Sequence, residues 1–130
     1  MDGERQELIT YRLEQAQDAL QQAYLLQENG HSSGSVNRAY YAMFYAVQAL
    51  VAKHGATVSK HGGAIAFFDR EIVKPERVGR DFSKWLHWLF DLRQDADYGT
   101  GNTPTEQQAK EGIEAAGRFV NEVRQRINEL

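Results

Sequence analysis

The stretch Asn37–His54, NRAYYAMFYAVQALVAKH, decides the fold of this chain. Apolar or aromatic residues occupy nearly every position from Ala39 to Ala52. A half-buried strand would alternate apolar with polar residues, and a surface helix would show a broad polar face. The pattern therefore predicts a helix that is packed on most of its circumference. Steps of four and three residues, as in a heptad, connect Val36, Tyr40, Met43, Val47, Leu50 and His54.

A neighbouring face of the same helix carries polar-tipped side chains, namely Arg38, Tyr41, Tyr45 and Gln48. An unpaired polar group costs free energy when it is buried, so the guanidinium and phenol groups of this face need partners. The partners lie elsewhere in the chain, in a second copy of it, or in a ligand. This face is therefore the first candidate for a functional surface.

The composition is that of one ordinary globular domain spanning residues 1–130, with 42% hydrophobic and 25% charged residues. The absence of cysteine excludes disulfides, thiolate metal sites and a cysteine nucleophile. A net charge of −3 argues against strong non-specific binding of nucleic acid, although it leaves room for a local basic patch. With no long apolar run and no basic-then-apolar leader, we expect no membrane association and a cytoplasmic location.

The remaining apolar periodicity predicts four further helices, over about residues 7–29, 59–73, 78–97 and 104–130. Residues 1–6 lack the period and are expected to lie outside the first helix. The polar residues 31–35 are expected to connect that helix to the central one. Ser59 is the expected N-cap of the short helix. The capping-box pattern of residues 103–106, with a proline at the first helical position, marks the start of the last helix.

Four long helices and one short segment predict an all-α fold, an up-and-down four-helix bundle with an additional short crossover helix. If the short segment crosses the end of the bundle, the fourth helix runs antiparallel to the central helix. Its last turn, with Arg93, Asp97 and Tyr98, then lies beside Arg38 and Tyr41. If the short segment is instead a full member of the bundle, these groups lie at opposite ends. Its length and its paired glycines favour the first arrangement.

Arg93 and Asp97 continue the apolar face of the fourth helix, where core residues would otherwise stand. Together with Arg38, Tyr41, Tyr45 and Tyr98, they could bind a phosphate through two guanidinium groups and position a ribose. The alternative is that Asp97 pairs internally with an arginine and that the tyrosines are core residues with solvated hydroxyls. Residue types alone favour this alternative, because arginine–carboxylate networks are common at the ends of bundles.

Lys60 and His61 precede two glycines and an apolar run, a pattern that could form a small anion site at a helix N-terminus. An ordinary capped helix start explains the same residues more simply. The four histidines share no metal-ligand spacing, so we expect neither a metal nor a cofactor.

The segments NRAYYAMFYAVQALVAKHG, SKHGG and LRQDADYG, in this order, resemble the HEPN domain family, in particular its small stand-alone prokaryotic members. The resemblance covers nearly the whole chain. It implies an all-α bundle that forms homodimers, with the ends of the two fourth helices facing a shared cleft. Many members are metal-independent endoribonucleases that use an arginine followed, four to six residues later, by a histidine. Small members often form toxin–antitoxin pairs with a minimal nucleotidyltransferase.

By this resemblance Arg93 takes the place of the motif arginine, and Tyr98 stands where the histidine is expected. A tyrosine, with an ordinary pKa of about 10, transfers protons poorly near neutral pH. We therefore expect a homodimeric module that binds RNA, a nucleotide or a nucleotidyltransferase partner within a toxin–antitoxin pair. The arginines would hold phosphate, Asp97 would orient one of them, and Tyr41 and Tyr98 would contact sugar or base. The alternatives are a metal-independent endoribonuclease that uses Arg93 and Tyr98, and a purely structural dimerisation domain.

Overall fold

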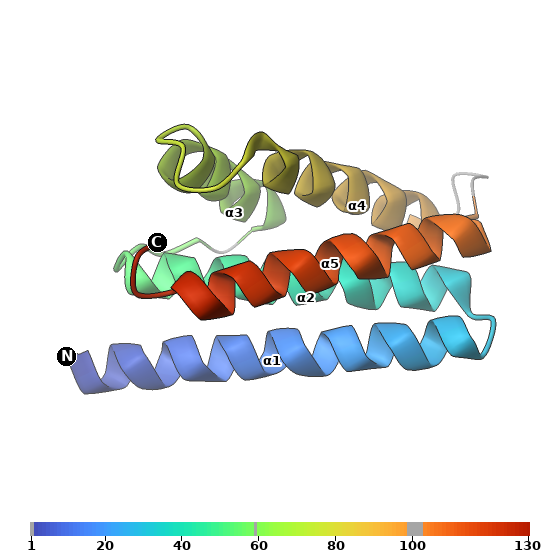
Figure 1. Cartoon of the computed structure of the whole chain (residues 1–130), viewed down its shortest axis with the longest axis horizontal. Helices are drawn as coiled ribbons and strands as arrows, with labels where there is room; N and C mark the ends of the chain where they lie inside the picture. The colour runs from blue at the N-terminus through green and yellow to red at the C-terminus, as the bar shows by residue number, and fades with distance from the viewer. Residues whose placement is uncertain (1, 59, 99–102) are drawn as a thin grey trace.

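The computed structural model describes residues 2–58, 60–98 and 103–130. Every regular element within these residues is a helix (Figure 1). The elements in chain order are α1 (Asp2–Glu28), α2 (Ser32–Lys53), α3 (His61–Phe68), the π-helical segment η1 (Asp69–Val73), α4 (Arg80–Tyr98) and α5 (Glu106–Arg126). The predicted all-α class is thus confirmed.

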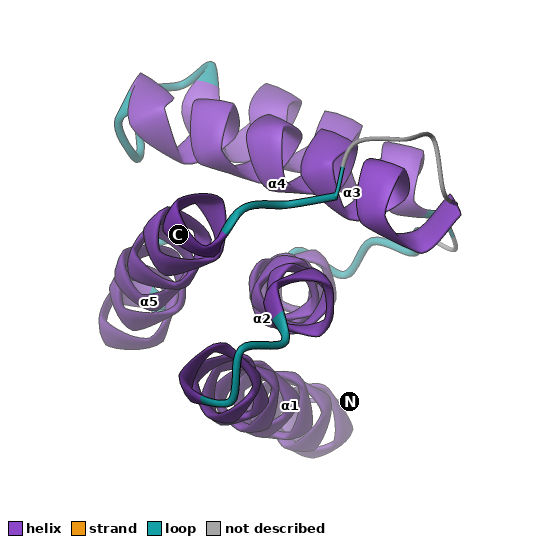
Figure 2. Cartoon of the chain, turned by 90° about the vertical axis from the view of Figure 1, so that its right-hand side faces the viewer, coloured by secondary structure: helices purple, strands orange, loops and turns teal. Residues whose placement is uncertain are grey.

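The four long helices, α1, α2, α4 and α5, run alternately in opposite directions, and α3 with η1 crosses between α2 and α4 (Figure 1). Seen along the bundle, α2 lies at the centre, with α1, α5 and the α3–α4 layer around it (Figure 2). This is the predicted up-and-down bundle with one additional crossover helix. Because α4 is antiparallel to α2, the last turn of α4 lies beside the first turns of α2.

The central helix α2 is enclosed because apolar and small side chains cover most of its circumference. Tyr40, Met43 and Leu50 of the heptad row are fully buried. Burying one large apolar side chain of this kind contributes about 1.5–3 kcal/mol to folding. Toward α1, the hydroxyl of Ser35 donates to the carbonyl oxygen of Ala23 at 2.8 Å, so this buried polar group is satisfied.

Two helix starts differ from the sequence prediction. Residues 2–6 belong to α1, and within them the side chain of Arg5 lies against Gly55, with Nη2 3.2 Å from the position of an added Cβ. α2 begins at Ser32 rather than after a polar connector, and the hydroxyl of Ser35 bonds to α1 instead of capping α2. At each end of the α1–α2 pair, a contact between the two segments therefore accompanies helical residues that the apolar spacing did not predict.

The helix caps also differ in detail. Ser59 lies outside the described residues, and the N-cap of α3 is Lys60, whose side chain makes no capping bond. The capping box of α5 is formed by Thr105 and Gln108, two residues later than the predicted pattern, with reciprocal bonds of 3.0 and 2.9 Å. Pro104 is buried just before this N-cap, where an apolar residue can staple the chain to the first turns of the helix.

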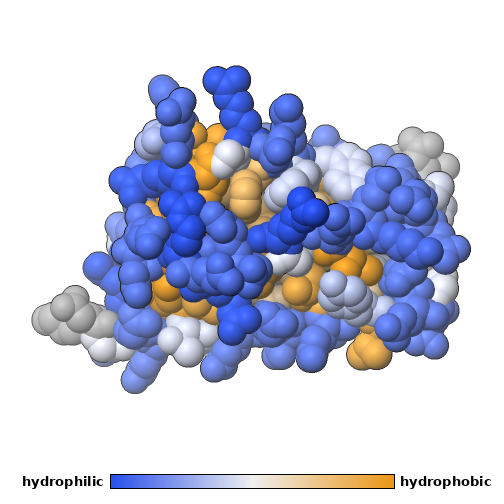
Figure 3. All heavy atoms as spheres, viewed as in Figure 1, coloured by the Kyte–Doolittle hydropathy of each residue, from blue (hydrophilic) through white to orange (hydrophobic). Residues whose placement is uncertain are grey.

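The outer surface of the bundle is mainly polar. The face drawn in Figure 3 is largely hydrophilic, and its apolar side chains form small patches between charged ones. Across the described parts of the chain, no helix combines the length and apolar character that a membrane crossing requires.

Candidate functional site

Arg93 of α4 is buried in the middle of an aromatic wall formed by α2 and α4. Its side chain is almost wholly enclosed, with a relative exposure of 5% for the residue. The guanidinium carbon lies 5.1 Å from the ring centroid of Tyr40, 5.8 Å from that of Tyr41 and 5.5 Å from that of Phe90. A cation over an aromatic ring is attracted by the ring quadrupole, so these rings hold the charge in place.

In the part of the chain that the structure describes, this guanidinium uses little of its hydrogen-bonding capacity. Nη1 of Arg93 donates to Oδ2 of Asp97 at a long 3.4 Å. Nε of Arg93 is fully buried and has no hydrogen-bond partner within residues 2–58, 60–98 and 103–130. An unsatisfied buried donor costs about 1–3 kcal/mol, more when it is charged, and so requires an explanation.

Asp97 links Arg93 to the first turns of α2. Its Oδ2 accepts a hydrogen bond from Nδ2 of Asn37 at 3.0 Å, and Oδ1 of Asn37 accepts one from Nε of Arg38 at 3.1 Å. The guanidinium of Arg38 lies 4.9 Å from the ring centroid of Tyr41. The predicted juxtaposition of Arg38 and Tyr41 with Arg93 and Asp97 is therefore present. Asn37 joins it without having been expected, although it directly precedes the arginine of the predicted face.

His61 is the second residue that the structure brings to this wall. Its Nδ1 and the hydroxyl of Tyr40 are hydrogen bonded at 2.8 Å, and its ring lies 4.4 Å from the ring of Phe44, centroid to centroid. Burial, assisted by the positive charge of Arg93, lowers the pKa of His61 below its ordinary value. Burial also raises the pKa of Tyr40, against the opposing effect of Arg93, so the phenol stays protonated.

Lys60 and His61, which the sequence could place together at a small anion site, lie in different surroundings. Lys60 is exposed at the N-cap of α3, whereas the imidazole of His61 turns inward to the rings of α2. The sequence gives no signal for this, because the contact joins two helices.

The two outer tyrosines are less involved. Tyr98 is 71% exposed as the last residue of α4. The ring of Tyr45 is half-buried and continues the aromatic row of α2 through Tyr41 and Phe44, at 5.9 and 6.0 Å. We therefore call Tyr40, Tyr41, His61, Phe90, Arg93 and Asp97 the Arg93 cluster.

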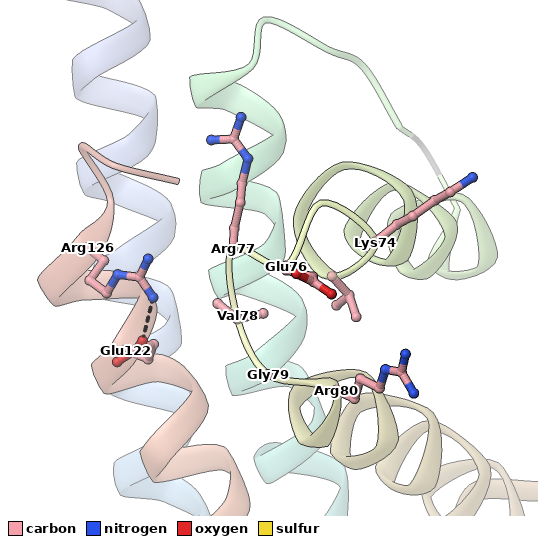
Figure 4. A pocket seen from close by; sticks show the side chains of 9 residues that line it. Lys74, Glu76, Arg77, Val78, Gly79, Arg80, Glu122 and Arg126 are labelled. Atoms are coloured by element: carbon pink, nitrogen blue, oxygen red, sulfur yellow. Dashed lines mark hydrogen bonds and ion pairs between the residues drawn. The ribbon is translucent and has the colours of Figure 1, made fainter.

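A hollow of about 570 Å³ lies at the other end of α4, lined by residues of the η1–α4 connection and of α5 (Figure 4). It is rich in cations, but Arg126 is already paired with Glu122 at 2.8 Å. The side chains of Lys74 and Arg77 point in different directions (Figure 4). Arg80 and Arg93 are separated by about 20 Å along α4, at 1.5 Å per residue. This hollow is therefore separate from the Arg93 cluster.

Within the described ranges, no group of three or more histidine or acidic side chains could hold a metal ion. The cluster instead combines a buried guanidinium, a carboxylate, phenol groups and an imidazole. These groups suit binding of an oxyanion and transfer of a proton.

The bundle and its buried arginine define a small all-α module with an enclosed guanidinium between two of its helices. The HEPN domain family model matches residues 9–126, and the chain belongs to this family. A UPF0332 protein of Thermotoga maritima is 35% identical over 128 residues, which cover 98% of this chain and 97% of the relative. Two relatives from Methanocaldococcus jannaschii carry the name "Putative toxin". One is 32% identical, over a match that covers 95% of this chain and 92% of the relative. The other is 25% identical, over a match that covers 86% of this chain and 76% of the relative.

Proposed function

We propose that this HEPN protein is a toxin-like module whose Arg93 cluster binds a phosphate group of RNA. The observation that carries the proposal is the enclosed guanidinium of Arg93. Among the described residues its Nε has no partner, and its one hydrogen bond there is long. A guanidinium fork matches the oxygens of a phosphate, and a charge surrounded by rings is less screened than one in water. The ligand would replace a weak internal contact rather than compete with a strong one.

Asp97 is the more exposed member of its ion pair with Arg93. The side chain of Asp97 is 29% exposed, and both Asn37 and Arg38 beside it are half-buried. A phosphate that takes the place of the Asp97 carboxylate would reach Arg93, while Arg38 offers a second cation nearby. Tyr41 lies between the two arginines and is placed to contact a sugar or a base.

The biological setting of the proposal comes from the relatives and the resemblance. Two relatives are named as toxins, which supports a toxin-like role. A homodimer and a nucleotidyltransferase partner follow from the family resemblance, and the exposed ring of Tyr98 at the end of α4 is available for such a contact.

Calorimetric titration in a chelating buffer tests the proposal, with a short single-stranded RNA and ATP as separate ligands. The change Arg93→Gln should weaken RNA binding by about 10- to 150-fold, the equivalent of one charge-assisted hydrogen bond of about 1.5–3 kcal/mol. Arg118→Gln is the matched control, because Arg118 is an exposed arginine of α5 that pairs with Glu114. Absence of RNA binding by the native protein at low salt, or equal binding by a folded Arg93→Gln variant, would refute the proposal. Binding of ATP alone would assign the site to nucleotides.

A second candidate function is a metal-independent endoribonuclease. The observation that favours it is the presence of His61 beside Arg93, because an imidazole supplies the proton transfer that Tyr98 was poorly suited to perform.

A further inference from the structure

Most of the exposed large apolar side chains in the described part of the chain belong to α1. Five such side chains are exposed there, and four of them are Leu8, Tyr11, Tyr24 and Leu25 of this helix. The helices that α1 packs against in the described chain are α2 and α5, and it lies on the opposite side of α2 from the α3–α4 layer (Figure 2). Exposed apolar side chains scattered singly need no explanation, whereas a concentration on one helix indicates an interaction surface.

Tyr11 and Leu25 lie in one outward stripe of α1, where they are 53% and 61% exposed. Steps of three and four residues from Glu4 to Glu28 define this stripe, as in a heptad seam, and all of its positions are exposed. Besides Tyr11, Leu25 and Gln21, the stripe consists of acids, namely Glu4, Glu7, Glu14, Asp18 and Glu28. It contains no lysine or arginine. We call these positions the α1 stripe.

Most carboxylates of the α1 stripe lack a counter-ion within the described ranges. Glu7, Glu14, Asp18 and Glu28 form no ion pair there. Glu14 and Asp18 are one helical turn apart, where like charges repel each other and slightly destabilise a helix. The exposed surface of α5 differs, because it pairs three cations with acids that lie one turn away. Helix stability therefore does not explain why the α1 stripe carries a single sign of charge.

The two arginines of α1 lie outside the stripe. The guanidinium of Arg5 lies against Gly55, at the end of α2. Arg12 is half-buried, and its Nη1 donates to Oε1 of Gln15 at 2.8 Å. Its guanidinium carbon is 5.8 Å from the ring centroid of Tyr11, so this ring already accepts one cation at the edge of the stripe.

We propose that the α1 stripe is a docking surface for a basic amphipathic helix of a partner protein. Lysine and arginine side chains of that helix would face the carboxylates, and its apolar side chains would cover Tyr11 and Leu25, which are two heptads apart. Carboxylates repel the phosphates of RNA and of an anionic membrane, so neither of these fits the surface. Packing of two α1 stripes against each other would bring like charges together, which argues against a second copy as the occupant.

The spacing of the two apolar residues provides a specific test. The probe is a labelled synthetic helical peptide of three heptads, with two leucines fourteen residues apart and lysines at the other seam positions. Fluorescence anisotropy with the full chain should show binding of this peptide. A second peptide of the same composition, with its leucines seven residues apart, should bind at least about fivefold more weakly, because one leucine then meets Asp18 or another polar position. A peptide with glutamate in place of lysine should not bind.

Two double variants separate the apolar from the charged contribution. Tyr11→Ala combined with Leu25→Ala should weaken binding of the first peptide by at least about fivefold. Glu14→Gln combined with Asp18→Gln should weaken it by about 2- to 30-fold, the equivalent of two exposed ion pairs. All four positions are exposed, so circular dichroism should show folded proteins.

The matched control is Glu106→Gln combined with Glu111→Gln, which removes the same charge from exposed positions of α5. At physiological salt this control should keep its affinity within about twofold, because charges away from the contact are screened. Lack of binding by the native protein, equal binding of the two leucine spacings, or an equal loss in the α5 control overturns the proposal. If the native chain self-associates in sedimentation and Tyr11→Ala with Leu25→Ala abolishes this, the α1 stripe is an interface between copies and the assignment to a basic partner is wrong.

Discussion

Replacing Arg93 by methionine should separate a ligand-binding role from a structural one. Methionine fills a similar volume against the same rings but carries no charge and no hydrogen-bond donor. The change removes an almost fully buried cation whose Nε has no partner among the described residues. Apolar replacement of a buried charged group is often neutral or stabilising, because the cost of its desolvation disappears.

The magnitude follows from three contributions to the free energy of unfolding. Loss of the cation–ring attraction destabilises by about 2 kcal/mol, and loss of the 3.4 Å bond to Asp97 by less than about 1 kcal/mol. Removal of the unsatisfied Nε and of the buried charge stabilises by about 1–4 kcal/mol. The net change should therefore lie within about 2 kcal/mol of zero.

Urea unfolding of both proteins gives the free energy change, and calorimetric titration gives RNA affinity on the same samples. We expect Arg93→Met to keep its stability within the stated range and to lose at least tenfold in RNA affinity. A loss of more than about 4 kcal/mol together with unchanged RNA binding would show that the arginine only fixes the register of the helices. That result would refute the ligand-binding argument and favour a structural domain.

Two further predictions concern packing and pH. A Cβ added at Gly112 would lie 3.0 Å from Cδ2 of Leu89, whereas one added at Gly117 would meet nothing within 4 Å. Gly117→Ala should therefore stabilise the protein by about 0.5–1 kcal/mol through helix propensity, while Gly112→Ala should give no gain or a loss of stability. Thermal unfolding of the two variants measures this. Equal gains in stability for both variants would contradict the contact between Gly112 and Leu89. His61 has a lowered pKa in the folded state, so its unfolded form binds the proton more tightly and stability should fall as pH drops below about 6.5. His61→Gln should remove this part of the acid sensitivity in denaturation curves, and an identical pH dependence of the two proteins would argue against the buried imidazole.

The helices and the all-α fold class were predictable because the spacing of apolar residues is a local property of the sequence. The row through Tyr40, Met43 and Leu50 predicted the buried helix α2, and the same period carried through Arg93 predicted a charged residue facing the core. Helix starts were less predictable. Residues 2–6 and the turn around Ser35 are helical because of contacts between α1 and α2, which the local pattern does not encode.

The sequence by itself determined an all-α bundle, its family and a buried arginine in α4. The spacing of apolar residues and the order of the motifs can both be read directly from the sequence. Only the tertiary structure decided which side chains surround that arginine. His61 stands about thirty residues from Arg93 in the sequence and reaches the same rings because α3 crosses over α2 and α4. His61 and Arg93 are close because α3 packs against α2 and α4. The spacing of residues within one helix gives no information about such packing.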